Sequence, residues 1–305
     1  MPTRYSMKAV TRLTGLSADR LRVWESRHGV VSPARTGTGR RYYSEKDVSR
    51  LKLLAELLQL GHSIGGICAL SDRELLALQT KSGSSANHDL EVADISELMS
   101  AVADFRLDAL RASLAKVKHL LSPQDFAFRL VPQVMAGVGE RVEEGKFNIA
   151  QEHAVSDLLR HQLRQIYDDL QPLNERKKFT VVLGAPEGHM HDFGVLLVAI
   201  RCRFHGLETH FLGPNLPHES LVNAAKELKA SALVLGVSAI PPEEVKVEID
   251  AYLKAVDASL PRKISLWLGG SGAGAIQRKK LERDVWIFAS IDELEQKLKT
   301  GSFGA

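Results

Sequence analysis

The segment that decides the fold is 179–194, FTVVLGAPEGHMHDFG, in which an apolar run ends at Gly184 and a loop carrying His189 and His191 follows. Similar runs, each followed by an amphipathic stretch, occur at 208–213, 232–240, 264–268 and 285–289. Strands that alternate with helices predict a doubly wound parallel α/β (Rossmann-like) sheet. Ligands of such sheets bind where strands end, so each histidine is a candidate metal ligand or proton carrier, with a simple loop residue as the alternative.

A histidine, a hydroxylated residue and glycines follow three strands of this predicted sheet. His191 and Gly194 follow the first strand, Ser238 follows the third, and Gly269-Gly270 follow the fourth. No GxGxxG follows the first strand, which argues against a dinucleotide site. We therefore expect one deep groove that is lined by small residues and has a single histidine able to ligate a bound group. The glycines would let a long tail of that group pass close to the backbone.

Length and composition predict several domains of an ordinary globular protein. The 305 residues are 44% hydrophobic and 25% charged, and they include no apolar stretch that suits a signal peptide or a membrane span. The two cysteines, Cys68 and Cys202, form no CxxC metal motif, so a cytoplasmic location is the default expectation. Residues 1–75 contain 13 Lys and Arg against 7 Asp and Glu, which suggests a polyanionic partner for this part.

The first part of the chain is predicted to be helical with one glycine-rich interruption. Met7–Thr14 favours a helix, Gly15-Leu16 a turn, and Ser17 the N-cap of a second helix, which together make a helix-turn-helix pattern. The segment PARTGTGRRYYSEKDV, 33–48, predicts a hairpin or wing, and a leucine-rich helix follows it.

Composition and hydrophobic period divide the rest of the chain. The segment TKSGSSANHD is small and polar and predicts a linker, and the period is helical again from Leu90 to Leu170. Ser122-Pro123 is expected to begin one of these helices, and Gly145 to end it. The predicted domains are 1–79 (winged helix-turn-helix), 90–175 (helical-bundle cap) and 176–305 (α/β domain), with 80–89 as the linker.

The segment 5–51 resembles the MerR family of winged helix-turn-helix proteins, with matches at Leu21-Arg22-Val23-Trp24-Glu25 and at Gly39…Arg41…Tyr43…Asp47-Val48. The resemblance implies binding of a duplex DNA operator. Arg20 and Arg22 would reach base edges or flanking phosphates, and the wing would clamp the backbone, whereas Trp24 is expected in the core. The expected DNA-contacting residues are Ser17, Arg20, Arg22, Arg35, Arg40, Arg41, Tyr42 and Tyr43.

The C-terminal part resembles the cobalamin-binding domains that carry DxHxxG…SxL…GG. In this sequence, 43 residues separate His191-Asp-Phe-Gly194 from Ser238-Ala-Ile240, and a further 28 residues separate that segment from Gly269-Gly270. The resemblance implies that His191 ligates the cobalt of cobalamin, while the nucleotide tail enters a groove lined by the serine and the glycines. Two positions depart from the pattern, because His189 replaces the acidic residue that would polarise the ligand and Ile240 replaces leucine.

The middle part resembles the cap of light-responsive MerR repressors of the CarH/LitR type, whose motif is a tryptophan, nine residues and Glu-His. Glu152-His153 are present, but Val142 stands at the tryptophan position and Glu143 follows it. The resemblance implies that Val142, Glu152 and His153 contact the upper ligand of the cofactor. Valine leaves unfilled much of the area that an indole would cover, so a response to adenosylcobalamin and light is expected to be weak or absent.

These observations predict a transcriptional regulator, and no catalytic residue. A repressor is favoured, whose cobalamin-binding domain controls self-association as a dimer or tetramer and binding to a palindromic operator. A protein antirepressor is a further candidate partner, and no membrane is expected. The alternatives are a cofactor-independent regulator that docks a protein or another tetrapyrrole, and a corrinoid methyl carrier, for which the winged helix would have no use. A zinc site from His153 and His161 lacks a further ligand at metal spacing.

Overall fold

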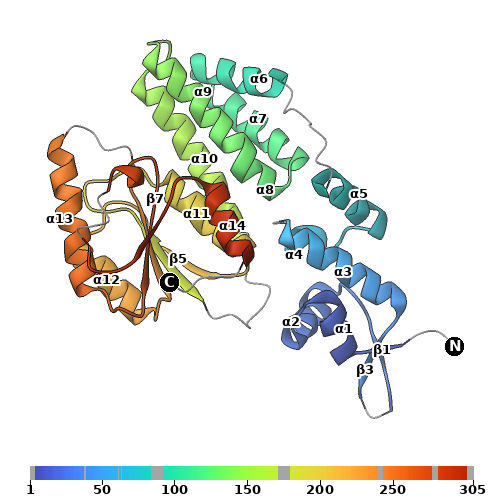
Figure 1. Cartoon of the computed structure of the whole chain (residues 1–305). Helices are drawn as coiled ribbons and strands as arrows, with labels where there is room; N and C mark the ends of the chain where they lie inside the picture. Colours follow the sequence, from blue (N-terminus) through green and yellow to red (C-terminus); the bar gives the residue numbers. More distant parts are fainter. Residues whose placement is uncertain are drawn as a thin grey trace. The chain divides into compact units, whose positions relative to one another are not determined.

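The computed structural model (Figure 1) describes residues 4–37, 39–60, 62, 64–83, 92–170, 179–238, 243–276 and 281–300. The chain divides into two compact units, Met1–Asn174 and Glu175–Ala305. The first unit contains a winged helix and a helical bundle, and the second contains the α/β domain. No helix among the described residues has the length and apolar character to cross a membrane.

The winged helix combines short helices with a three-stranded antiparallel sheet of order β1-β3-β2. Its elements are β1 (Tyr5–Ser6), α1 (Met7–Thr14), α2 (Ala18–Val23), the π-helical turn η1 (Trp24–His28), β2 (Ala34–Arg35), β3 (Arg41–Tyr43), α3 (Glu45–Gln59), α4 (Ile64–Ile67) and α5 (Asp72–Gly83). The predicted helix-turn-helix and wing are confirmed. The predicted linker begins too early, because α5 continues to Gly83, and the remainder of 80–89 lies outside the described residues.

Polar caps fix the ends of the first helices. The Ser17 hydroxyl accepts a hydrogen bond from the backbone N–H of Arg20 at 3.2 Å, which places the N-terminus of α2 where the sequence predicts it. Gly15 ends α1 with φ of 71°, a left-handed conformation that a residue with a Cβ atom adopts at a cost. Trp24 is buried, as expected, in a core that includes Leu21 and Leu54.

The side chain of Arg50 on α3 joins three segments of the winged helix. Its Nε donates to the carbonyl oxygen of Val30 at 3.0 Å, and its Nη2 donates to those of Cys68 and Leu70 at 2.9 and 2.8 Å. Its Nη1 pairs with Asp72. These charge-assisted bonds link α3 to the loop after η1 and to the segment between α4 and α5.

The helical bundle contains four main helical stretches. They are α6 (Val92–Ala103), α7 (Leu107–Leu120), the continuous run α8 (Pro123–Asp125), η2 (Phe126–Leu130) and α9 (Val131–Glu143), and α10 (Ile149–Asp169). Ser122 caps the third stretch and Gly145 follows it with φ of 69°, as predicted. Gln151 on α10 donates from its side-chain amide to the carbonyl oxygens of Val102 and Ala103, both at 3.0 Å, which ties α10 to the end of α6.

The α/β domain is a parallel five-stranded sheet of order β5-β4-β6-β7-β8, which confirms the predicted doubly wound class. Helices α11 and α14 cover one face, and α12 and α13 cover the other (Figure 1). The elements are β4 (Thr180–Gly184), α11 (Phe193–Phe204), β5 (Glu208–Phe211), α12 (His218–Glu227), β6 (Ala232–Gly236), α13 (Glu243–Ser259), β7 (Ser265–Gly269), η3 (Ala273–Ala275), β8 (Val285–Phe288) and α14 (Ile291–Thr300).

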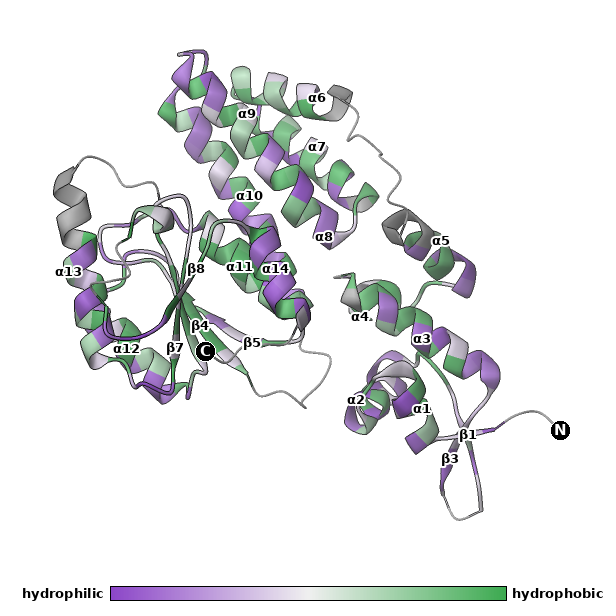
Figure 2. Cartoon of the chain, in the orientation of Figure 1, coloured by the Kyte–Doolittle hydropathy of each residue, from purple (hydrophilic) through white to green (hydrophobic). Residues whose placement is uncertain are grey.

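The order of these strands locates the ligand-binding edge. Strand β4 has β5 on one side and β6 on the other, so the chain leaves β4 and β6 in opposite directions. Such a switch point opens a crevice at the carboxyl ends of the two strands. Strands β4 and β6 and helix α11 consist mainly of hydrophobic residues (Figure 2), whose burial fixes this part of the sheet, and the polar residues of the site lie in the loops.

Candidate functional site

The loop after β4 presents two histidines in different environments. His191 and Met190 are exposed, whereas His189 is only 7% exposed. The backbone of His189 is held on both sides, because its N–H donates to the Pro186 carbonyl at 2.9 Å and its carbonyl accepts from Asn215 N–H at 3.0 Å. The loop therefore directs one imidazole inward and leaves the other at the carboxyl edge of the sheet.

The inward histidine bridges the switch point. Nδ1 of His189 lies 3.0 Å from the hydroxyl oxygen of Ser238, which follows β6. Burial, and the neighbouring His191 imidazole, lower the pKa of His189 below its usual value, so the ring is neutral at pH 7 and one of its nitrogens can accept a hydrogen bond from the hydroxyl. Two predicted site residues, His189 and Ser238, are thus brought together and are bonded to each other.

Gly269 ends β7 and Gly270 follows it, at the place where a groove for a ligand tail is expected. A Cβ atom on Gly269 would lie 2.2 Å from Cζ of Phe288, and one on Gly270 would lie 2.3 Å from the carbonyl oxygen of Val237. Side-chain and backbone atoms of the chain therefore fill the places where these Cβ atoms would lie, and the expected groove for a ligand tail stays a prediction. Sequence reasoning missed Phe288. The feature that could have indicated it is its position as an aromatic residue at the end of the last predicted strand.

The remaining predicted residues of this edge are less constrained. Gly194 is exposed at the start of α11, with nothing within 4 Å of where a Cβ atom would lie. Ile240 lies outside the described residues. The exposed imidazole of His191 is a donor of the kind that can ligate the cobalt of a corrinoid, and this role stays a prediction. Beside Gly269, the ring of Phe288 occupies the place where a Cβ atom would lie.

The predicted cap residues lie on two helices of the bundle. Val142 is half-buried near the end of α9. The Glu152 carboxylate accepts a hydrogen bond from Ser156 at 2.7 Å and lies 3.4 Å from Nε2 of His153, whose side chain is 74% exposed. Their contact with a cofactor stays a prediction. Within the described part of the chain, no three His, Cys, Asp or Glu residues are grouped closely enough to hold a metal ion, which gives the zinc alternative no support.

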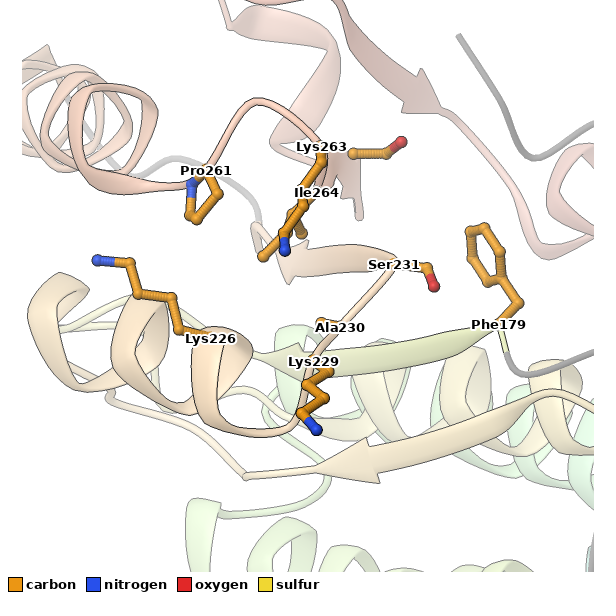
Figure 3. A pocket seen from close by; sticks show the side chains of 9 residues that line it. Phe179, Lys226, Lys229, Ala230, Ser231, Pro261, Lys263 and Ile264 are labelled. Carbon is orange, nitrogen blue, oxygen red and sulfur yellow. The ribbon is translucent and has the colours of Figure 1, made fainter.

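A separate cavity of about 460 Å³ lies at the opposite, amino-terminal edge of the sheet (Figure 3). Phe179 and Ser231, which directly precede β4 and β6, contribute to its lining. Lys226 lies in the last turn of α12 and Lys229 follows the end of that helix, where cations offset the partial negative charge of the helix terminus. The cavity is therefore distinct from the carboxyl edge of the sheet, which bears His191.

The predicted DNA-reading residues lie on and beside α2. Arg22 is exposed and pairs with Asp19 one turn earlier at 2.5 Å. Arg20 is half-buried, and the Ser17 hydroxyl is engaged as the N-cap. Val23 is 41% exposed and adjoins Arg22, so the outer face of the helix is partly apolar. Such a face can meet both base edges and thymine methyl groups in a major groove.

The wing separates the predicted DNA residues into two groups. Arg35 and Arg40 are exposed and Tyr42 is half-buried, as backbone-contacting residues require. Tyr43 is fully buried and donates its hydroxyl to Glu25, so its prediction as a DNA contact is wrong. Burial and the Glu25 carboxylate raise the pKa of this hydroxyl above its usual value, which keeps the proton in place.

Arg41, which the sequence predicts as a DNA contact, pairs with a carboxylate of the same chain. Its Nε donates to the Glu25 carboxylate at 2.6 Å, and the side chains of Arg41 and Glu25 are 26% and 9% exposed. The hydrogen bond is charge-assisted and both side chains are largely buried. The pair therefore fixes the wing to the turn that follows α2. Glu25 was not a predicted functional residue, although it belongs to the motif that carries the resemblance.

Comparison with protein families assigns both halves of the first unit. Residues 5–74 match the MerR HTH family regulatory protein, and residues 95–167 match the B12 binding domain. The first match spans the winged helix, and the second spans most of the helical bundle.

Comparison with known proteins extends over nearly the whole chain. The chain is 30% identical over 296 residues to the HTH-type transcriptional repressor CarH of Myxococcus xanthus, covering 96% of this chain and 97% of that protein. It is 25% identical over 194 residues to the dimethylamine corrinoid protein of Methanosarcina barkeri, covering 63% of this chain and 90% of that one. The structure of the monomethylamine corrinoid protein of Methanosarcina barkeri has the same fold, with a TM-score of 0.51 and 16% identity over 67% of this chain and 96% of that one.

Proposed function

This chain belongs to the MerR-type DNA-binding regulators that carry a B12-binding domain, and from that we propose that it is a transcriptional repressor whose operator binding and self-association depend on bound cobalamin. The observation that carries the proposal is the exposed imidazole of His191 at the switch point of a parallel sheet, in a chain that begins with a winged helix. A corrinoid methyl carrier is not favoured, because such a carrier has no use for the DNA-binding part.

Within this proposal, residues of the α/β domain hold the cofactor. His191 supplies the axial imidazole, and the bond between His189 and Ser238 holds the β4 loop in place beside it. When bound, the cobalamin supplies a cobalt centre whose ligation state can differ between conditions. A regulator needs such a difference, because a ligand shifts an equilibrium only by its differential affinity for two states.

Self-association and partners are a further part of the proposal. A symmetric dimer, or a tetramer, would place two winged helices on the two halves of a palindromic operator. A protein antirepressor that binds the cobalamin-dependent part would relieve repression. Mass photometry with and without cobalamin and operator DNA tests this part, and a mass that stays monomeric under every condition would contradict it.

The DNA-binding role predicts distinct effects of two exposed arginines. Arg40→Ala should weaken binding to an operator selected from random duplexes and to unrelated duplex alike, and lower the salt dependence by roughly one phosphate contact. Arg22→Ala should instead cost about 1–3 kcal/mol on the operator and much less on unrelated DNA, if it reads a base. Fluorescence anisotropy at several salt concentrations measures both effects.

An exposed arginine outside the helix-turn-helix and wing provides the control for these variants. Arg73→Ala on α5 removes the same charge and should leave both affinities nearly unchanged. If all three variants lower affinity equally, the binding is a general charge effect and the assigned interface is wrong.

The departure at Val142 predicts a weak response to light. The missing aromatic burial is worth at most about 1–3 kcal/mol, which is comparable to a whole coupling free energy between two sites. We therefore expect the native chain, loaded with adenosylcobalamin, to keep its oligomer mass and operator affinity after green illumination. Val142→Trp should introduce a light-induced fall in both, whereas Val142→Leu should not. A large fall in the native protein would contradict this expectation.

A further inference from the structure

Two paired glycines at the carboxyl edge face the α11–α14 side of the sheet. Gly236 on β6 is the cross-strand partner of Gly269 on β7. Leu235 and Leu268, the residues before them, belong to the core on the α12–α13 side, and successive strand residues point to opposite faces. The place where two side chains would stand is therefore beneath α11 and α14, close to the edge that carries Ser238.

Side chains of the protein occupy both of these places. A Cβ atom on Gly236 would lie 2.0 Å from Cγ2 of Val195 on α11. A Cβ atom on Gly269 would lie 2.2, 2.4 and 3.0 Å from Cζ, Cε2 and Cε1 of Phe288, so three atoms of one ring fill the space. Phe288 is 2% exposed. The glycines of the site thus serve internal packing in this conformation.

The ring of Phe288 is held by a row of aromatic neighbours. Its centroid lies 5.0 Å from that of Trp286, which meets Trp267 edge-on at 5.2 Å. Nζ of Lys297 on α14 lies 4.2 Å above the Trp286 ring, and Phe179 stacks on Trp267 at 5.9 Å. A ring in such a row leaves its position at the cost of buried area and aromatic contacts.

We propose that Phe288 determines which corrinoids the site accepts, by occupying the space beside Gly269 that the nucleotide tail of a complete cobalamin needs. A corrinoid without a nucleotide, such as cobinamide, can meet His191 without moving this ring. A complete cobalamin must displace it before its tail can pack beside the glycine. This inference rests on the proposed function, because it concerns the same cofactor edge.

The test compares hydroxocobalamin with cobinamide on the full chain. Each is titrated by absorbance into the native protein and into Phe288→Ala, and the ratio of the two dissociation constants is taken for each protein. The tail no longer competes with a buried phenyl ring in the variant, so the ratio of the cobalamin constant to the cobinamide constant should fall roughly 10- to 100-fold. Phe288→Leu should show a smaller fall in the same direction.

Phe179→Ala is the matched control, because it removes a ring from the same aromatic row at the opposite edge of the sheet. It should leave the ratio unchanged. Thermal denaturation of the ligand-free proteins tests the geometry separately. Gly269→Ala should strongly lower the melting temperature of the native chain, and should be better tolerated in a Phe288→Ala background.

The outcomes separate this inference from the function on which it rests. If both corrinoids bind and Phe288→Ala leaves their ratio unchanged, the role of Phe288 is wrong and the proposed function stands. If neither corrinoid binds to the native chain or to any variant, both are wrong. An equal change of the ratio in Phe179→Ala would show a general loss of packing, which also overturns the role of Phe288.

Discussion

Replacing His191 with alanine is expected to abolish the signal of cobalt ligated by a protein imidazole in the cobalamin-loaded chain. His191 is the exposed histidine of the β4 loop, whereas His189 is buried and bonded to Ser238. Only an exposed imidazole can approach a corrinoid ring without unfolding the loop. The measurement is electron paramagnetic resonance of the reduced cobalt(II) form in protein labelled with ¹⁵N-histidine, where the label changes the nitrogen splitting of the native protein.

Two further histidine variants make the result specific. His161→Ala on α10 removes another exposed imidazole and should keep the labelled splitting. His189→Ala should keep it as well but weaken cobalamin binding, because the loop loses its bond to Ser238. A labelled splitting that survives in His191→Ala would place the ligand elsewhere. The same splitting lost only in His189→Ala would assign the ligation to the buried histidine after a rearrangement of the loop.

The fold could be predicted from the sequence because its signals are local and repeated. Five apolar runs of strand length, separated by helical stretches, leave few arrangements other than a parallel α/β sheet. The caps at Ser17 and Ser122 and the turn at Gly15 lie where the sequence places them, because each depends on a residue and its neighbours within one helical turn.

The candidate site could be predicted only in part because its decisive contacts join distant segments. A strand-end glycine has the same sequence signal whether its missing side chain leaves space for a ligand or for a ring, so Gly269 did not reveal Phe288. The histidine pair was found from its position after a strand, but which imidazole points inward depends on contacts such as that between Asn215 and His189.

The wing residues show the same limit in the DNA-binding part. A tyrosine or arginine in a polar hairpin gives the same sequence pattern whether it contacts a DNA phosphate or a carboxylate of its own chain. Arg40 and Arg41 are adjacent in sequence, yet Arg40 is exposed just before β3, whereas Arg41 in β3 pairs with a carboxylate. Glu25, 16 positions before Arg41, decides that Arg41 is the one that is turned inward.

Arg41→Ala is therefore expected to destabilise the winged helix rather than simply to weaken DNA binding. Removal of the guanidinium leaves the Glu25 carboxylate, 9% exposed, with the Tyr43 hydroxyl as its remaining polar contact in the part of the chain that the structure describes. The expected loss in the free energy of unfolding is roughly 3 kcal/mol, at the lower end for one partner of a buried pair because Arg41 keeps a quarter of its side chain exposed. Urea denaturation followed by circular dichroism measures it.

Two comparisons decide whether the ion pair is the cause. Arg40→Ala removes the adjacent, exposed charge and should change the unfolding free energy by less than about 0.5 kcal/mol while still weakening DNA binding. Adding Glu25→Gln to Arg41→Ala removes the uncompensated buried charge and should recover part of the lost stability, as a negative coupling in a double-mutant cycle. If Arg41→Ala leaves stability unchanged and lowers affinity for all duplexes alike, Arg41 is a phosphate contact after all. In that case its pairing with Glu25 contributes nothing to the fold, since a group that stabilises the folded state must lower stability when it is removed.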